Sequence, residues 1–207
     1  TLKFGNSTTI EYLIDRLKKV KNDVNIILCT TTLDKDQILV DIANKHKISY
    51  FQGSEKDKLD RWLKACLKFG IDYFVTADGD DLFCDPEMID LAFNQFEMKD
   101  PDMIKSENIV CGAFTYGIKF KALEKVCEIK DSDDTEMMWH YFIDTGLFEI
   151  QELEGVNPKY FRDDIRMTLD YEEDLHFFNK VVKLSNNPKS FISMEEILKI
   201  CDSNPDV

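Results

Sequence analysis

The feature that most constrains this chain's fold is an alternation of short apolar runs with amphipathic segments over its first half. The apolar runs, rich in β-branched and aromatic residues, occupy 24–31, 48–51 and 72–76, and segments with helical spacing or helix-start signals separate them. Strands that alternate with helices form a largely parallel sheet covered on both faces and joined by right-handed crossovers. We therefore expect an α/β fold.

Helix-start signals place several of the helices. Thr8-Thr9-Ile10-Glu11 has the pattern of a capping box and predicts a helix over residues 8–21. Asp85 followed by Pro86 predicts another helix start, with the aspartate as N-cap. The same reasoning predicts further helices at 34–47, from 54–57 to about Gly70, from about 171 to 184, and at 194–201.

After residue 98 the alternation of strand-like and helix-like segments ends. Residues 102–120 hold β-like runs with little between them, and residues 131–153 combine an acidic loop, an aromatic-rich segment and a further strand. This pattern predicts a small antiparallel excursion over 102–160, and residues 166–169 then predict a final strand. The length suits one domain, residues 1–207, with a C-terminal helical appendage at 185–207.

Charge and cysteine usage exclude several classes of protein. Forty acidic residues against 26 basic ones give a net charge of −14, which disfavours a nucleic-acid partner. The acidic excess begins at Asp78, because residues 1–77 are slightly basic. The chain has no apolar run near the ~18 residues of a membrane span and no secretory signal, so a cytoplasmic protein without membrane contact is expected. Six scattered cysteines without a C-x-x-C pair favour reduced thiols.

The tetrapeptide Asp78-Gly79-Asp80-Asp81 directly follows the expected strand 72–76. Ligands of open α/β sheets bind at the carboxyl ends of strands. Carboxylates crowded there need a cation to offset their repulsion, and Mg²⁺ or Mn²⁺ is the natural one. The alternative is a solvated acidic turn that has no ligand.

A second acidic site follows the expected strand 166–169. Asp170 ends that strand and precedes a helix, so its plainer role is an N-cap, with Glu173 completing a capping box. It becomes a metal ligand if the last strand lies beside the strand that ends at Asp78.

Two other strand ends carry polar groups. Residues 53–61 place polar side chains and free amides at a helix start, where a phosphate or a base edge can bind. An ordinary capped helix is the alternative there. Thr30 and Thr31 end the strand 24–31, so their hydroxyls also stand at a strand's carboxyl end, but a threonine run alone does not indicate a ligand.

In this order the motifs resemble the cytidylyltransferases that activate acidic sugars, in the SpsF-like and acylneuraminate cytidylyltransferase-like branch. The resemblance covers most of residues 1–184. It rests on residues 11–17, the strand and threonine run at 26–32, residues 51–61, Gly79-Asp80 with Asp85-Pro86, residues 122–124, and residues 166–174.

The resemblance implies a Rossmann-like, GT-A-like nucleotidyltransferase fold of three layers, with a mostly parallel sheet, in a homodimer. It implies transfer of CMP from CTP to an acidic sugar or a related acidic metabolite, with Mg²⁺ and release of pyrophosphate. Asp80 matches the aspartate of a G-D motif and Asp170 that of a D-x-x-E-D motif, the catalytic pair that holds the metal. We expect the nucleotide at Thr30, Thr31, Ser54, Arg61 and Asp78, and the acceptor at Tyr116, Glu136, Trp139 and His140.

The chain also departs from that family. The family's N-terminal strand and R-x-P-x-K phosphate loop would precede Thr1, so a protein that begins at Thr1 is expected to be inactive. Thr76 and Leu82 stand where the branch commonly has Arg and Pro. Aromatic residues at 114 and 116 stand where related proteins often have carboxylates, so sialic acid is not assumed as the acceptor. For Trp139 a core or dimer-interface role is an equal alternative.

Two rival functions remain at this stage. Asp78-x-Asp80 is also the D-x-D pattern of a metal-dependent glycosyltransferase of the GT-A type, which would release a nucleoside diphosphate. A domain without its phosphate loop would instead be a non-catalytic partner subunit.

Overall fold

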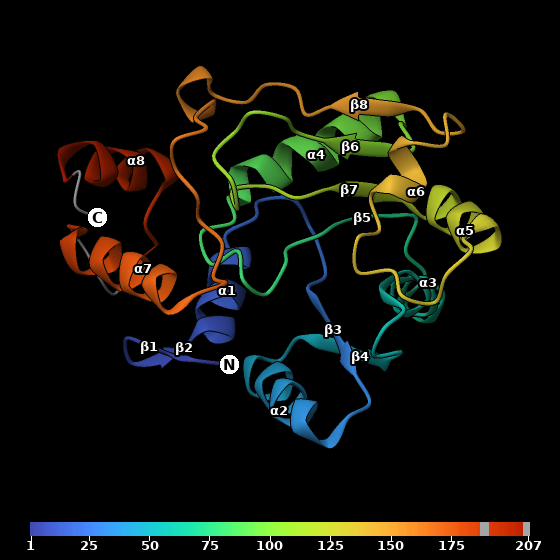
Figure 1. Cartoon of the computed structure of the whole chain (residues 1–207), viewed down its shortest axis with the longest axis horizontal. Helices are drawn as coiled ribbons and strands as arrows, with labels where there is room; N and C mark the ends of the chain where they lie inside the picture. Colours follow the sequence, from blue (N-terminus) through green and yellow to red (C-terminus); the bar gives the residue numbers. More distant parts are fainter. Residues whose placement is uncertain (187–190, 205–207) are drawn as a thin grey trace.

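Short strands and longer helices alternate along the chain, as the sequence predicts (Figure 1). The computed structural model describes residues 1–186 and 191–204. The strands are β1 (Lys3–Phe4), β2 (Ser7–Thr8), β3 (Ile27–Thr31), β4 (Ser49–Gly53), β5 (Tyr73–Val75), β6 (Met103–Lys105), β7 (Gly117–Lys119) and β8 (Ile150–Glu152). The helices are α1 (Thr9–Leu17), α2 (Gln37–His46), α3 (Lys58–Phe69), α4 (Pro86–Lys99), α5 (Phe120–Ile129), α6 (His140–Ile143), α7 (Glu172–Leu184) and α8 (Met194–Ser203), with 3₁₀ turns at Asp34–Asp36 and Pro158–Tyr160.

The strands form two main sheets and a small hairpin. β3 and β4 pair in parallel, and β5, β7, β6 and β8 form a second sheet in that order. Within the second sheet β7 is antiparallel to both neighbours, so β5, β6 and β8 share one direction. The α/β fold is confirmed with mixed sheets, in which β7, from the part of the chain where an antiparallel excursion was expected, is the strand that runs against its neighbours.

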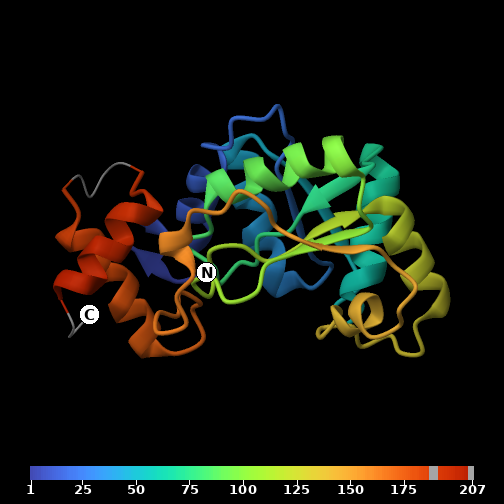
Figure 2. The same ribbon diagram turned by 90° about the horizontal axis from the view of Figure 1, so that it is seen from above.

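Helices cover both faces of the four-stranded sheet, which makes three layers. Side chains that alternate along β6 enter two different cores: Met103 packs in a cluster with α3, α5 and α6, and Ile104 in one with α4. Figure 2 shows α4 and α6 on opposite faces of these strands. Gly117 of β7 is needed for this packing, because a Cβ there would lie 2.7 Å from the Phe96 ring.

A gap separates the two sheets. Within residues 1–186 and 191–204, β3 pairs only with β4, and β5 pairs only with β7, so each strand has one unpaired edge. Adjoining cavities of about 440 and 600 Å³ lie between these edges. Their apolar lining comes from α1, β3 and β5, for example Leu17, Ile27 and Val75. The gap leads to the carboxyl end of β5, where the acidic tetrapeptide begins.

Most predicted helix ends are confirmed. The amide of Glu11 donates to Thr8 Oγ1, and the Glu11 carboxylate accepts from the amide of Thr8 at 2.9 Å, which is the capping box. Asp85 caps α4 with Pro86 in its first turn, and α3 ends at Gly70 in the left-handed conformation with φ +66°.

Three sequence predictions are wrong in detail. The helix predicted over 8–21 ends at Leu17, and the strand predicted over 24–31 begins at Ile27. Residues 166–169 are not a strand, because they make a single bridge, Cys111 with Arg166. The segment nevertheless lies between Cys111 and Asp80, held by isolated backbone contacts and a side-chain hydrogen bond rather than by a ladder.

The C-terminal helices α7 and α8 pack together at one side of the molecule (Figure 1). Buried Arg16 of α1 ties this part to the rest of the fold: its Nε donates to the Cys84 carbonyl at 2.7 Å and its Nη1 to the Ile192 carbonyl at 2.6 Å. The domain prediction for 1–207 remains a prediction, and residues 187–190 and 205–207 of it lie outside the described part. Across the described ranges, no helix combines the length and apolar character that crossing a membrane requires.

Glu11 gives a testable contribution to stability. Hydrogen bonds from Lys45 and Ser7 hold the pKa of this carboxyl at about 2, against the penalty of its burial. A depressed pKa means stability that is present above pH ~4.5 and lost as the pH falls toward 2. We expect Glu11→Gln to lower the free energy of unfolding by ~1–2 kcal/mol at pH 7. Urea melts should show a smaller difference in the free energy of unfolding between wild type and Glu11→Gln at pH 3 than at pH 7. Glu124→Gln, in an exposed pair with Lys121, is the control. An equal deficit at both pH values would contradict the assignment.

Candidate active site

The acidic tetrapeptide folds as a tight turn at the end of β5. The Thr76 amide donates to the Tyr116 carbonyl at 2.8 Å, which continues the pairing of β5 with the chain that leads into β7. The Asp81 amide then donates to the Asp78 carbonyl at 3.0 Å, and the Cys84 amide to the Asp81 carbonyl at 2.9 Å. The turn therefore presents its carboxylates at the carboxyl end of a sheet strand, as predicted.

The segment before Asp170 lies directly beside Asp80. The Leu169 amide donates to the Asp80 carbonyl at 3.0 Å, and the Thr168 hydroxyl donates to Asp80 Oδ2 at 3.2 Å. The Met167 amide donates to the Cys111 carbonyl at 2.9 Å on the other side. Tertiary contacts thus bring together the two aspartates that the sequence analysis paired, although they are 90 positions apart in the sequence.

Burial and mutual repulsion perturb these carboxyls. Burial raises the pKa of Asp80, and the neighbouring carboxylates of Asp78 and Asp170 raise it further. For Asp81, burial and then the charges of Asp80 and Asp78 raise the pKa to about 7. Perturbed carboxyls that share a strand end are a feature of functional sites.

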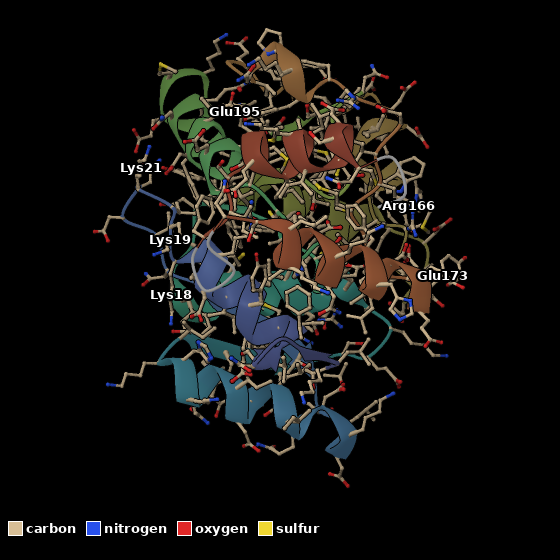
Figure 3. The ribbon with its side chains drawn as sticks, turned by 90° about the vertical axis from the view of Figure 1, so that its left-hand side faces the viewer. Lys18, Lys19, Lys21, Arg166, Glu173 and Glu195 are labelled. Carbon is tan, nitrogen blue, oxygen red and sulfur yellow. The ribbon has the colours of Figure 1, made fainter. Side chains whose placement is uncertain are left out.

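Arg166 balances part of this charge at the start of α7. Its guanidinium pairs with Asp170 and, at 2.6 Å, with Asp174. Figure 3 shows Arg166 on the same side of the molecule as Glu173, at the beginning of α7. The predicted N-cap role of Asp170 with Glu173 is wrong, because Asp174 accepts from the amides of Asp170 and Tyr171, both at 2.8 Å. The Asp170 carboxylate is therefore not used to cap the helix.

The arrangement fits a divalent cation held partly by its substrate. Among the described residues no three His, Cys, Asp or Glu side chains converge as a complete protein cage. Mg²⁺ needs no such cage, since one or two carboxylates plus substrate phosphates commonly hold it. Burial is the largest cause of the raised pKa of half-buried Asp80, and a cation would relieve the repulsion that Asp78 and Asp170 add to it.

The 440 Å³ cavity opens next to this acidic turn. The charged side chains in its lining are Lys58, Arg61, Asp78, Asp80 and Glu136, and Asn25 and Thr76 add uncharged polar groups. Arg61 and Asp78, predicted to bind the nucleotide, thus share one cavity with Asp80. Glu136, predicted for the acceptor, lines it as well.

Three residues predicted for the nucleotide lie outside this lining. Thr30 is buried, and Thr31 is engaged locally, since its hydroxyl donates to Asp36 and accepts from the Leu33 amide at 3.1 Å. Ser54 Oγ accepts from the Asp57 amide at 3.1 Å, inside the turn before α3. The hydroxyls of Thr31 and Ser54 therefore stabilise turns in this structure.

The remaining acceptor candidates are divided between two places. Tyr116 lies close to the site, because its amide donates to the hydroxyl of Thr76, two residues before the acidic turn, at 3.2 Å. Trp139 is exposed and its ring meets the His140 ring edge-on at 6.0 Å at the start of α6. None of Tyr116, Trp139 and His140 is among the described residues that line the 440 Å³ cavity.

A buried polar cluster places Glu136 in the cavity. Asp57, the N-cap of α3, accepts from the Thr135 hydroxyl at 2.9 Å and from Lys130 Nζ at 2.6 Å. Thr135 Oγ1 in turn accepts from the Leu59 amide at 3.0 Å. Thr135 is fully buried, so the acidic loop before α6 is anchored to the start of α3.

The sequence analysis missed Lys58, whose Nζ lies 3.1 Å from Asp78 Oδ1. A signal for it exists in the sequence. Lys58, Arg61, Trp62 and Ala65 recur at helical spacing, and all four line the cavity.

Comparison with known proteins agrees with this geometry. The profile of the family described as cytidylyltransferase matches residues 1–202. The chain belongs to the cytidylyltransferase family. Enzymes of this family use CTP. That the chain belongs to it favours nucleotidyl transfer over the rival glycosyltransferase function.

Individual relatives show how far the likeness extends. The uncharacterized protein MJ1063 of Methanocaldococcus jannaschii is 31% identical over 100% of this chain and 84% of its own length. The spore coat polysaccharide biosynthesis protein SpsF of Bacillus subtilis is 22% identical over 98% of this chain and 86% of its own. A cytidylyltransferase structure from Leptospira borgpetersenii superimposes with a TM-score of 0.88 at 22% identity, covering 99% of this chain and 87% of that one. The nucleotidyltransferase fold predicted from the sequence is confirmed.

Proposed function

We propose that this cytidylyltransferase transfers CMP from CTP to an acidic sugar or a related acidic metabolite and releases pyrophosphate. The observation that carries the proposal is the contact of Asp80 with the segment that ends at Asp170. It supports a site in which the carboxylates of Asp80 and Asp170 act together near the carboxyl end of β5, beside a cavity whose lining includes Lys58 and Arg61. The likeness to SpsF supports an acceptor destined for a polysaccharide.

In the proposed reaction an acceptor oxygen attacks the α-phosphorus of CTP, and the bond from that phosphorus to the bridging oxygen of pyrophosphate breaks. The acceptor proton leaves to solvent or to a site carboxylate. Positioning and charge stabilisation do most of the work in such a transfer. Asp80 and Asp170 are the residues that would hold Mg²⁺ or Mn²⁺, which when bound neutralises charge on the phosphates.

Different residues in and near the cavity are the candidates for binding the nucleotide and the acceptor. Arg61 is the first nucleotide candidate, because its Nε is buried and has no hydrogen-bond acceptor among the described residues. A base or sugar oxygen of the nucleotide would satisfy it. Glu136 and Tyr116 flank the acidic turn and are the better placed acceptor candidates, whereas Trp139 and His140 stay predictions. Thr30, Thr31 and Ser54 also stay predictions for the nucleotide.

The gap between β3 and β5 fits the same proposal. Two unpaired strand edges that line an apolar cavity are stabilised when another strand pairs with them. We infer that an N-terminal strand of the kind the resemblance implies occupies this gap and brings a phosphate-binding loop to the site. The homodimer and the cytoplasmic location also remain predictions, the first of which sedimentation velocity would test.

A pyrophosphate-release assay tests the function directly. The complete protein would be incubated with Mg²⁺, each nucleoside triphosphate in turn and a panel of acidic acceptors. We expect release with CTP and at least one acidic sugar. Release of a nucleoside diphosphate from a nucleotide sugar would instead support the glycosyltransferase. No turnover with any pair would support the non-catalytic subunit.

A further inference from the structure

Lys58 occupies an unusual position for a lysine. It is the first residue of α3, and its side chain is only 15% exposed, although its neighbours Lys56 and Lys64 point to solvent. Its ammonium lies 5.1 Å from the centre of the Trp62 ring and 3.1 Å from Asp78 Oδ1. The chain therefore holds a cation against the acidic turn, at the mouth of the 440 Å³ cavity.

Helix capping does not explain this placement. Asp57 caps α3 by accepting from the Asp60 amide at 3.1 Å, and its second oxygen accepts from Lys130. Lys58 thus has no part in the polar cluster that anchors the start of α3, as far as the described contacts show. Its ammonium is directed to Asp78, which is itself 35% exposed and able to turn away.

The second cation of the cavity, Arg61, is held to the backbone through its Nη1, which leaves its Nε as the group without a partner among the described residues. Arg61 Nη1 donates to the backbone carbonyls of Ser54 and Glu55, which fixes the loop before α3. Among the described residues, the hydrogen-bond partner of the Lys58 ammonium is a side-chain carboxylate, that of Asp78, rather than a backbone carbonyl. An ammonium on a flexible stem can exchange that carboxylate for another oxyanion without loss of backbone structure.

We propose that Lys58 binds an oxyanion of the substrate at the carboxyl end of β5, and that Asp78 holds the lysine in place until the substrate arrives. This inference rests on the proposed function. The oxyanion has two sources, a phosphate of the nucleotide or the carboxylate of the acceptor. Both offer the same charge-assisted hydrogen bonds to an ammonium.

The test compares Lys58→Met with Lys58→Arg and with Lys64→Met as the control. Methionine keeps much of the stem that packs on Trp62, and Lys64 pairs with Asp60 on the exposed side of the same helix. CTP binding is measured by calorimetry with Mg²⁺ and without acceptor, and the KM of the acceptor by pyrophosphate release. Thermal melts report whether each variant folds.

We expect Lys58→Met to weaken CTP binding about ten-fold, with Lys58→Arg recovering most of it and Lys64→Met unchanged. A normal CTP affinity with a raised acceptor KM assigns the oxyanion to the acceptor and also supports the proposal. Unchanged CTP affinity and unchanged acceptor KM would overturn it. A wild-type protein that binds no nucleoside triphosphate would overturn the proposed function, and this inference with it.

Discussion

Replacing Asp80 with asparagine is expected to lower kcat for pyrophosphate release by about 10³-fold, equivalent to ~4 kcal/mol of transition-state stabilisation. The amide keeps the size of the side chain and can still accept from the Thr168 hydroxyl, so the fold should survive. What is lost is the negative charge that the proposed cation needs. Asp170→Asn should have an effect of similar size, because the two carboxylates act on one ion.

The melting temperature of Asp80→Asn tests independently whether Asp80 is a functional rather than a structural residue. The pKa of Asp80 is raised by burial and by neighbouring carboxylates, so its ionised form opposes folding. A raised folded-state pKa means that stability is lost as the pH rises above ~4. Asp80→Asn should therefore melt at the same or a higher temperature than the wild type at pH 7, and this advantage should disappear at low pH. Loss of activity with unchanged or increased stability is typical of a functional site.

Asp163→Ala is the matched control for these variants. Asp163 is exposed, lies seven positions before Asp170 and should leave both kcat and melting temperature unchanged. Full activity of Asp80→Asn or of Asp170→Asn at saturating Mg²⁺ would refute the catalytic pair. A collapse of the melting temperature would show instead that the carboxylate is structural.

Gly112→Ala should have the second largest effect, through the backbone. Gly112 has φ +84°, and a Cβ there would lie 2.2 Å from the Met167 carbonyl oxygen. No side chain can relieve a clash with a backbone oxygen, so residues 110–113 would have to separate from residues 166–168. We expect a loss of ~3 kcal/mol or more in the free energy of unfolding. Catalysis should fall as well, because this segment holds Asp170 beside Asp80.

Gly146→Ala is the control that separates the backbone penalty of a positive φ from the clash with Met167 expected in Gly112→Ala. Gly146 has φ +66° and open space where its Cβ would be, so alanine there costs only the conformational penalty of about 1 kcal/mol. Urea melts and steady-state kinetics on both variants make the comparison. Equal destabilisation of the two would mean that the contact between Gly112 and Met167 has no role in holding the segment.

Local sequence patterns predicted the elements of this fold well. The capping box at Thr8, the N-cap at Asp85 and the helix end at Gly70 depend on residues a few positions apart, so their physics is visible in the sequence. The antiparallel excursion was also predicted, since the apolar runs after residue 98 lack a helix between them. The strand at 166–169 was wrong because pairing depends on a partner that local propensity does not report.

The site shows the same division. The sequence by itself determined that acidic residues follow β5 and precede α7, and the family resemblance paired Asp80 with Asp170. The tertiary structure alone decided that a capping role falls to Asp174, that the Thr31 hydroxyl is used in a turn, and that Lys58 reaches Asp78 across 20 positions. The reason is physical: a side chain's partner is chosen by packing between distant segments. Helix and turn signals are settled within a few residues.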